Sequence, residues 1–253
     1  MSRATTDEVV IVTGGSRGIG AAIARQLGHA GSAVCINYLQ NSEAADAAAA
    51  EVDAGGGRAI TVKGDTCDRD AMTALYDRAT AELGPVTGLV NNAGITGGIG
   101  LFSDLDEDTM RRVVDVNVIG FMIPSQIAVR RMSTRLGGAG GNIVNISSIA
   151  ATFGSPKEYV HYAATKGAID VFTLGLAREV ATEGIRVNAV SPGLIETDIH
   201  ASGGDPDRVD RLSNRIPMKR GGTAAEVAEA VCWLLSDAAS YVTGAVLPVA
   251  GGR

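Results

Sequence analysis

The sequence predicts an α/β fold in which a doubly wound parallel sheet of about seven strands carries helices on both faces. Short apolar runs rich in Val, Ile and Leu alternate with longer helical patterns along all 253 residues. Most of these runs are continuously apolar rather than alternating, as expected of strands that are buried on both faces. Alternation of strands and helices produces a parallel sheet with right-handed crossovers. We therefore expect one domain spanning residues 1–253.

The elements follow from these patterns in chain order. Strands are expected at Val9–Thr13, Ala33–Asn37, Ala59–Lys63, Leu89–Asn91, Asn142–Ile146, Arg186–Val190 and Ala245–Val249. Helices are expected at Gly18–Ala30, Ser42–Asp53, Arg69–Leu83, Glu107–Leu136, Tyr159–Glu183 and Ala224–Leu235. Asp68 and Thr223 are N-cap residues, and Glu226 completes a capping box with Thr223. Gly120 and Pro124 interrupt the fourth helix, and the proline is expected to bend it because it removes an i→i−4 hydrogen bond.

One long stretch, Leu194–Arg220, has no clear periodicity and follows a strand. Ligands of such sheets bind at the carboxyl ends of the strands, so we interpret residues 194–220 as a substrate lid. The alternative is an ordinary irregular connection on the surface.

Composition excludes several classes of function. The 22 Lys and Arg residues against 28 Asp and Glu residues give a net charge of −6, which disfavours non-specific nucleic-acid binding. The cysteines (Cys35, Cys67, Cys232) and the three histidines are scattered, so no disulfide framework and no metal site are expected. The first residues lack the apolar region of a signal peptide, and no stretch of about 18 apolar residues follows. We therefore expect a cytoplasmic protein without membrane partners.

A glycine-rich turn, Thr13-Gly14-Gly15-Ser16-Arg17-Gly18-Ile19-Gly20, directly follows the first strand and leads into a helix. Its glycines allow close backbone approach, and the helix N-terminus offers free N–H groups to a pyrophosphate. The turn lacks the lysine of a nucleoside-triphosphate P-loop. This predicts a dinucleotide site of the Rossmann type.

The residues around the turn favour NADP(H) over NAD(H). The second strand ends at Asn37-Tyr38, where an NAD-preferring site would place an acidic residue on the ribose hydroxyls. No Asp or Glu occurs between Glu8 and Glu43. Arg17 could meet a 2′-phosphate, although it could also be a solvated turn residue.

The segment Tyr162-Ala163-Ala164-Thr165-Lys166 places a phenol and an ammonium on one helix face. A phenol titrates near pH 10 in water, which is too high for a good base at neutral pH. A neighbouring ammonium, together with a cationic nicotinamide, would lower the pKa of the phenol and make it a general base. The alternative is a surface pair of small energetic consequence.

Several motifs occur in a recognisable order: TGGSRGIG (13–20), GDT (64–66), NNAG (91–94), Asn117 in VNV, Ser147-Ser148, YAATK (162–166) and SPG (191–193). With these motifs the chain resembles the short-chain dehydrogenase/reductase family over essentially its whole length. Within that family it is most similar to the bacterial glucose/ribitol-dehydrogenase-like group.

The resemblance implies that four residues are catalytic: Asn117, Ser148, Tyr162 and Lys166. Tyr162 would be the general acid/base, and Lys166 would lower its pKa and hold the nicotinamide ribose. Ser148 would bond the substrate oxygen, Asn117 would position a water, and no metal would take part. With the glycine-rich turn and the end of the second strand, the expected cofactor contacts are Gly14, Ser16, Arg17, Gly18, Ile19, Gly20, Asn37, Tyr38, Asp65, Thr66, Asn92, Ala93, Gly94, Tyr162, Lys166, Pro192, Gly193, Ile195 and Thr197.

The resemblance also implies an activity and an assembly. We expect an NADP(H)-dependent oxidoreductase acting on a carbonyl or secondary alcohol, of sugar, polyol or 3-oxoacyl type. The alternative is a non-catalytic NADP(H) sensor or scaffold, whereas isomerase or dehydratase relatives usually carry a longer C-terminal domain. Because the helices Glu107–Leu136 and Tyr159–Glu183 have apolar residues on more than one face, and the family assembles through them, we expect a homotetramer.

Overall fold

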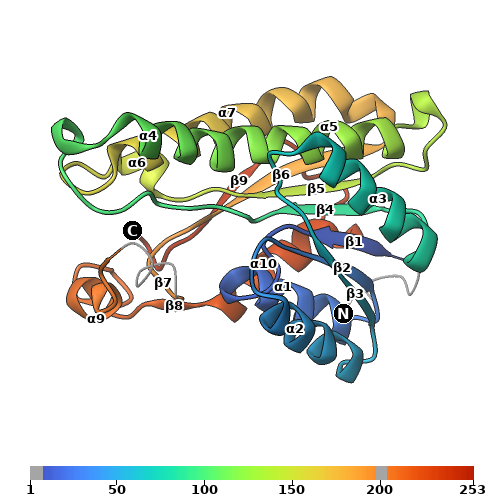
Figure 1. Cartoon of the computed structure of the whole chain (residues 1–253), viewed down its shortest axis with the longest axis horizontal. Coiled ribbons are helices and arrows are strands. Elements are labelled where there is room, and N and C mark those ends of the chain that lie inside the picture. The colour runs from blue at the N-terminus through green and yellow to red at the C-terminus, as the bar shows by residue number, and fades with distance from the viewer. Residues whose placement is uncertain (1–7, 198–203) are drawn as a thin grey trace.

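A computed structural model of the protein describes residues 8–197 and 204–253. Within these ranges seven parallel strands form one sheet in the order β3-β2-β1-β4-β5-β6-β9 (Figure 1). The strands are β1 Val9–Val12, β2 Ala33–Tyr38, β3 Arg58–Lys63, β4 Gly88–Asn91, β5 Gly141–Ile146, β6 Ile185–Pro192 and β9 Val246–Val249. The predicted Rossmann-type sheet is confirmed, and each strand boundary lies within one or two residues of its expected position.

Helices cover both faces of this sheet (Figure 1). One face packs against α1 Gly18–His29, α2 Ser42–Ala54 and α10 Ala224–Leu235, and the other against α3 Arg69–Leu83, α5 Gly120–Met132 and α7 Val160–Val180. The side chains of Asp68 and Thr223 accept hydrogen bonds from the first turns of α3 and α10, and Glu226 completes the expected capping box.

Two apolar clusters explain why the strands read as continuous apolar runs. Along β1, Val10 and Val12 pack into the cluster beneath α1, α2 and α10. Val9 and Ile11, which point the opposite way, pack into the cluster beneath α3, α5 and α7. Because successive side chains of a strand face opposite sides of the sheet, both sets must be apolar.

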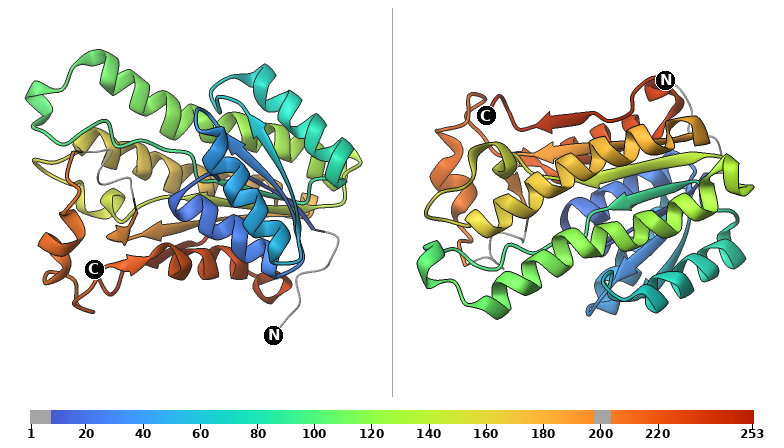
Figure 2. Two further views of the ribbon diagram at one scale, coloured as in Figure 1. Left: turned by 60° about the horizontal axis from the view of Figure 1, so that its bottom comes forward. Right: turned by 90° about the horizontal axis from the view of Figure 1, so that it is seen from above.

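The predicted interruption of the helix over Glu107–Leu136 lies just before Gly120 rather than at Pro124, and the helix ends at Met132 rather than Leu136. An α-helix, α4 Glu107–Val114, passes into a π-helical turn at Asp115–Ile119, after which α5 begins at Gly120 and contains Pro124. A 3₁₀ turn, Thr134–Leu136, follows separately. Figure 2 shows α4 and α5 running end to end alongside α7, against which α4 and the π-helical turn pack.

The continuous stretch Glu107–Met132 is long and apolar enough to cross a membrane by length and composition, and half of its most apolar window is buried inside the protein. Phe121, Ala128 and Met132 on this stretch are almost wholly buried. We interpret the stretch as a core helix.

Small elements at the carboxyl end of the sheet were not expected from the sequence. They are α6 Ala150–Phe153, α9 Arg208–Ser213, and a separate pair of short strands, β7 Ile195–Glu196 and β8 Gly222–Thr223. The predicted lid, residues 194–220, therefore contains β7 and α9, whereas its residues 198–203 lie outside the described ranges.

Candidate active site

The turn between β1 and α1 forms a cradle with backbone walls. Gly14 and Gly18 have φ angles of +60° and +54°, which favour glycine. A Cβ at Gly20 would lie only 2.4 Å from the Gly14 carbonyl oxygen. The first turn of α1, which the structure describes in full, contains no acidic residue, and its N-cap Arg17 makes no side-chain capping bond. Ser16 and Ile19 complete the turn, so the cradle fits the pyrophosphate of a dinucleotide.

Two side chains connect this turn to the loop that follows β4. The hydroxyl oxygen of Thr13 accepts hydrogen bonds from the backbone N–H groups of Asn92 (2.9 Å) and Ala93 (3.2 Å). The side-chain amide of Asn92 donates to the carbonyl oxygens of Thr13 and Gly14, both at 3.0 Å. β1 and β4 are neighbours at the point where the strand order reverses, which is where such sheets bind their ligands.

Asn37, at the end of β2, is hydrogen-bonded to the glycine-rich turn. Asn37 is 2% exposed, and its amide donates to the Gly64 carbonyl (2.9 Å) and accepts from the Gly14 N–H (3.4 Å). The Asn37 side chain is therefore occupied by backbone partners. Tyr38 is half-buried, whereas Arg17 is exposed and forms no ion pair with any residue of the described ranges.

The expected adenine-side residues follow β3. A carboxylate oxygen of Asp65 accepts a hydrogen bond from the Cys67 N–H (2.9 Å), and its other oxygen lies 3.6 Å from Arg112. Thr66 is buried against Gly120, where a Cβ would lie 2.5 Å from the Thr66 hydroxyl. This contact joins the adenine side to the start of α5.

On the nicotinamide side, the segment after β6 crosses toward the phosphate turn. Pro192 ends β6, Gly193 packs closely on Ala250, and Ile195 is buried. The side chain of Thr197 lies 3.6 Å from the position that a Cβ of Gly18 would take. Of the predicted cofactor residues on this side, Thr197 is therefore the one that lies against the glycine-rich turn.

Tyr162 and Lys166 lie on the buried face of α7. The ammonium of Lys166 is 3% exposed and donates a 2.8 Å hydrogen bond to the Ile146 carbonyl at the end of β5. It lies 4.9 Å from the ring centroid of Phe121 and 5.6 Å from that of Tyr162. The alternative of an exposed surface pair is wrong, because both side chains belong to the interior.

Burial dominates the proton affinity of both groups in the protein alone. It raises the pKa of the Tyr162 phenol to about 12, against a smaller lowering effect of the hydrogen bond from Ser148. It lowers the pKa of the Lys166 ammonium to about 8, and the Asp170 carboxylate partly offsets this. The sequence expectation of a lowered phenol pKa includes a bound cationic nicotinamide, so it stays a prediction for that complex.

The π-helical turn aims Asn117 at the same region. Its amide oxygen accepts from the Ile95 N–H (2.9 Å), and its NH₂ group donates to the Ile95 carbonyl (2.8 Å) and to the Thr165 hydroxyl (3.1 Å). A Cβ at Gly94 would lie 3.2 Å from the Asn117 amide oxygen and 3.7 Å from the Lys166 nitrogen. Asn117, Gly94 and Lys166 are therefore immediate neighbours.

The two serines after β5 have different partners. The Ser148 hydroxyl forms a hydrogen bond with Tyr162 and accepts another from the Ala150 N–H (3.1 Å). The Ser147 hydroxyl donates to Asp170 (2.5 Å), behind the site. Ser148 is therefore the serine beside the phenol. Among residues 8–197 and 204–253, no group of three or more His, Cys, Asp or Glu side chains could hold a metal ion.

Comparison with known proteins agrees with this geometry. Residues 14–253 match the family model described as enoyl-(acyl carrier protein) reductase. The oxidoreductase YgfF of Escherichia coli (strain K12) is 49% identical over 97% of this chain and 99% of its own length. Glucose 1-dehydrogenase 2 of Bacillus subtilis (strain 168) is 36% identical over 100% of this chain and 96% of its own. The chain belongs to the short-chain dehydrogenase/reductase family.

A solved structure extends the likeness to three dimensions. A short-chain dehydrogenase of Burkholderia cenocepacia J2315 in complex with NADP superposes with a TM-score of 0.89 at 35% identity, covering 99% of this chain and 98% of that one. The fold and the family expected from the motifs are thus confirmed, and the protein is a nicotinamide-dependent oxidoreductase of CH–OH and carbonyl groups.

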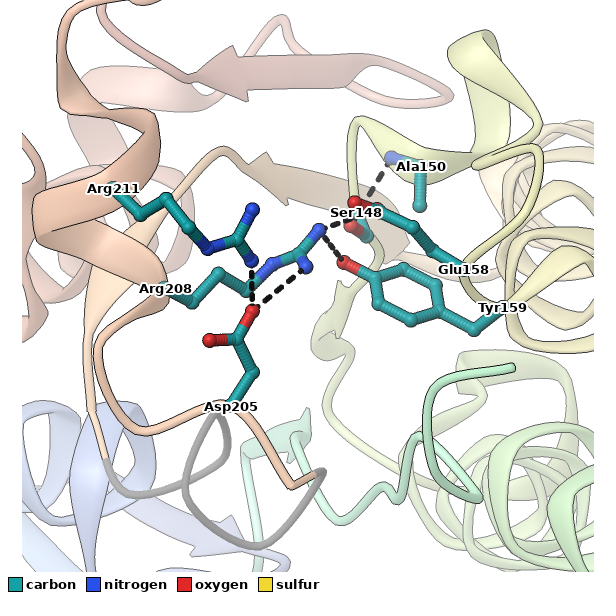
Figure 3. Close-up of polar contacts among 7 residues, drawn as sticks. All are labelled: Ser148, Ala150, Glu158, Tyr159, Asp205, Arg208 and Arg211. Atoms are coloured by element: carbon teal, nitrogen blue, oxygen red, sulfur yellow. Dashed lines mark hydrogen bonds and ion pairs between the residues drawn. The ribbon is translucent and has the colours of Figure 1, made fainter.

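A pocket of about 380 Å³ opens beside Tyr162 and Ser148. Its walls also contain residues that the family motifs do not indicate, among them Glu158, Tyr159 and Arg208. The rings of Tyr159 and Tyr162 meet edge to face with centroids 5.3 Å apart. Arg208 of α9 donates to Glu158 (2.5 Å) and to the Tyr159 hydroxyl (2.8 Å), as Figure 3 shows. Sequence patterns could not reveal this cluster, because Arg208 lies about 50 positions from Glu158 and Tyr159.

Proposed function

We propose that this protein is an NADP(H)-dependent oxidoreductase that transfers a hydride between the nicotinamide and a carbonyl or secondary alcohol, with Tyr162 as general acid/base. One observation carries the proposal: the buried phenol of Tyr162 borders a substrate-sized pocket whose lining also contains Ser148. The Lys166 ammonium lies behind the phenol ring.

Each of these residues has a distinct role in the proposed reaction. The nicotinamide, when bound, supplies the hydride to the carbonyl carbon or accepts it from the alcohol carbon. In reduction, Tyr162 gives its hydroxyl proton to the carbonyl oxygen, and Ser148 holds that oxygen by a hydrogen bond. Lys166 stabilises the resulting phenolate, and Asn117 occupies the route by which a proton returns toward the phenol.

Reduction and oxidation need different protonation states of the Tyr162 phenol. A pKa of about 12 keeps the phenol protonated at neutral pH, so that it is ready to donate to a carbonyl oxygen. Oxidation of an alcohol would need the phenolate, which a cationic neighbour must stabilise. We propose carbonyl reduction as the direction in the cell because the proposed NADP(H) preference favours it.

Preference for NADP(H) over NAD(H) rests on two features of the turn. Arg17 is exposed beside the phosphate cradle, and the α1 first turn carries no acidic side chain. The chain has no Asp or Glu between Glu8 and Glu43 that could bind the ribose hydroxyls and repel a 2′-phosphate. Separately, we propose that the segment predicted as a lid, residues 194–220, covers the substrate pocket beside Tyr162.

We also propose a cytoplasmic homotetramer. Exposed apolar side chains occur on α4, the π-helical turn and α7, namely Val114 (43%), Ile119 (39%), Val171 (72%) and Leu174 (40%). Because α4 and the π-helical turn pack against α7, these side chains lie on adjacent elements that a second copy could cover. A monomeric mass in light scattering at micromolar concentration would contradict this assembly.

A substrate panel tests the activity directly. The purified protein is mixed with NADPH or NADH and a set of ketones, aldehydes and oxo sugars, and the loss of reduced-cofactor absorbance is followed. We expect turnover with at least one carbonyl and a higher kcat/KM with NADPH. Binding of NADPH without turnover of any carbonyl or, with NADP⁺, of any alcohol would instead favour a sensor or scaffold protein.

A further inference from the structure

The pocket beside Tyr162 has a cationic end. Its charged lining consists of Arg208, Arg215 and Arg253 against the single carboxylate of Glu158. The same lining contains the hydroxyls of Ser148 and Tyr162. The pocket therefore offers both cationic groups and hydroxyl groups to one small molecule.

Arg208 is the unusual member of this cationic end. It is 3% exposed, and its side chain enters the pocket between α9 and the start of α7 (Figure 3). Its Nη2 atom donates to Glu158 and Tyr159, and its Nη1 atom lies 3.5 Å from an Asp205 oxygen as an ion pair. Yet Nε and Nη1 are buried without a hydrogen-bond partner among residues 8–197 and 204–253. Buried N–H groups left unbonded are costly, so the Arg208 guanidinium has hydrogen-bonding capacity that the described residues leave unused.

The charged groups around Arg208 favour an anionic ligand. Glu158 and Asp205 offset part of the arginine charge, and Asp205 is shared with Arg211. Arg215, at the mouth of the pocket, is exposed and forms no ion pair with the described residues. Arg253, also in the lining, is exposed and likewise forms no ion pair with the described residues, so the two unpaired arginines and the incompletely bonded guanidinium of Arg208 suit an anionic group such as a carboxylate.

The spacing of the aromatic rings limits the size of the ligand. The Arg208 guanidinium carbon lies 5.1 Å from the Tyr159 ring centroid, which lies 5.3 Å from that of Tyr162. The distance from the guanidinium to the catalytic ring cannot exceed the sum of these two spacings. Ile99, Phe153 and Leu194 add apolar surface for the body of the molecule.

Resting on the proposed function, we infer that the substrate is a small oxo acid or hydroxy acid, whose carboxylate binds at Arg208 and Arg215 while its carbonyl or hydroxyl carbon faces Ser148 and Tyr162. The reaction itself is unchanged: hydride adds to the ketone carbon and the Tyr162 proton adds to its oxygen. The carboxylate takes no part in the bond changes and serves only recognition.

Matched pairs of acids and amides test this inference. The probes are 4-oxopentanoate, 5-oxohexanoate and 6-oxoheptanoate, each compared with its primary amide, which has nearly the same shape without the charge. For each pair we measure kcat/KM with NADPH, or the competitive inhibition constants against any carbonyl that the panel shows to be reduced. We expect the best acid to exceed its amide by about 10-fold or more, and this advantage to shrink as salt screens the exposed Arg215.

Three variants separate recognition from structural support. Arg208→Gln should reduce the acid-to-amide ratio about 10-fold, and Arg215→Gln should reduce it by about 3-fold while leaving the melting temperature unchanged. Arg78→Gln, which removes an exposed arginine of α3 paired with Glu82, should leave the ratio as it is. Because Arg215 is on the surface, its variant remains informative if Arg208→Gln does not fold.

The outcomes distinguish this inference from the proposed function. Reduction or inhibition that favours the amide, or an acid preference that survives both pocket substitutions, would overturn the carboxylate assignment while leaving the oxidoreductase intact. Equal losses for acid and amide in Arg208→Gln, with no effect of Arg215→Gln, would assign Arg208 to holding α9 in place and overturn it as well. Stronger inhibition by a phosphomonoester would replace the carboxylate with a dianion. Absence of turnover with any carbonyl or alcohol would contradict the proposed function itself.

Discussion

Lys166 Nζ lies 5.6 Å from the centroid of the Tyr162 ring and 2.8 Å from the Ile146 carbonyl oxygen, in a compartment where both side chains are almost fully buried. An ammonium in such a place loses its hydration, and one carbonyl with two aromatic faces replaces only part of it. The chain therefore holds a charge at a cost in stability, directly behind the phenol that the proposed reaction uses.

This cost predicts how stability depends on pH. The pKa of Lys166 falls from an ordinary 10.5 to about 8 on folding. Between these values the unfolded chain binds a proton that the folded protein has released, so the folded state gains stability as pH rises. Relative to Lys166→Met, wild type should gain about 2 kcal/mol of unfolding free energy between pH 7 and pH 9.5, because one pKa unit corresponds to about 1.4 kcal/mol.

Urea titrations of both proteins at the two pH values measure this difference. Titrating groups distant from Lys166 are common to both proteins, so their contributions cancel. An unchanged difference would mean that the Lys166 ammonium is hydrated and is not desolvated as its burial indicates.

Two glycines, Gly20 and Gly175, should show opposite effects when each is replaced by alanine. At Gly20 a Cβ would lie 2.4 Å from the Gly14 carbonyl, so Gly20→Ala must displace the phosphate cradle. This displacement should cost a few kcal/mol of binding free energy and so weaken NADPH binding about 100-fold, as measured by calorimetry or fluorescence titration.

The matched control is Gly175, within α7, where no atom lies within 4 Å of the added Cβ. Gly175→Ala should keep NADPH affinity and raise stability by about 0.5–1 kcal/mol. Equal affinities of the two variants would exclude the turn as the cofactor cradle.

Arg17 should distinguish the two nicotinamide cofactors. Its exposed guanidinium is free to pair with the 2′-phosphate that only NADP(H) carries. Arg17→Gln should raise the KM for NADPH about 10-fold and leave the KM for NADH unchanged. Parallel steady-state titrations with the two cofactors provide the comparison, and a rise of equal size for both would remove the basis for NADP(H) preference.

The sheet and the helices covering it could be predicted closely from the sequence for a physical reason. Strands buried on both faces require continuous apolar runs, and each helix keeps one apolar side toward the sheet. Burial in these elements therefore gives a regular spacing of apolar residues that is visible over a short stretch of sequence. The motif residues could be placed for the same reason, since Tyr162 and Lys166 share a face of one helix.

Local patterns could not predict features that depend on distant partners. The π-helical turn at Asp115–Ile119 brings Asn117 to the backbone of Ile95 and the hydroxyl of Thr165, and neither partner is evident from the helix sequence. Asn37 occupies the expected cofactor position, yet its amide bonds the backbone of the next strand and of the glycine-rich turn. α9 has only six residues, too few for a periodic signal, although it supplies Arg208 to the pocket.

The single-turnover rate of carbonyl reduction by Tyr162→Phe tests the proposed proton donor most directly. This substitution removes only the hydroxyl of Tyr162 from the buried pair of Tyr162 and Lys166. Tyr241→Phe, at a fully exposed tyrosine, is the matched control. With a carbonyl that wild type reduces, we predict that Tyr162→Phe binds NADPH within about 3-fold of wild type and loses about 1,000-fold or more in the rate of reduction, whereas Tyr241→Phe retains both. A Tyr162→Phe protein that reduces the carbonyl within about 10-fold of the wild-type rate would contradict the assignment of this phenol as the proton donor.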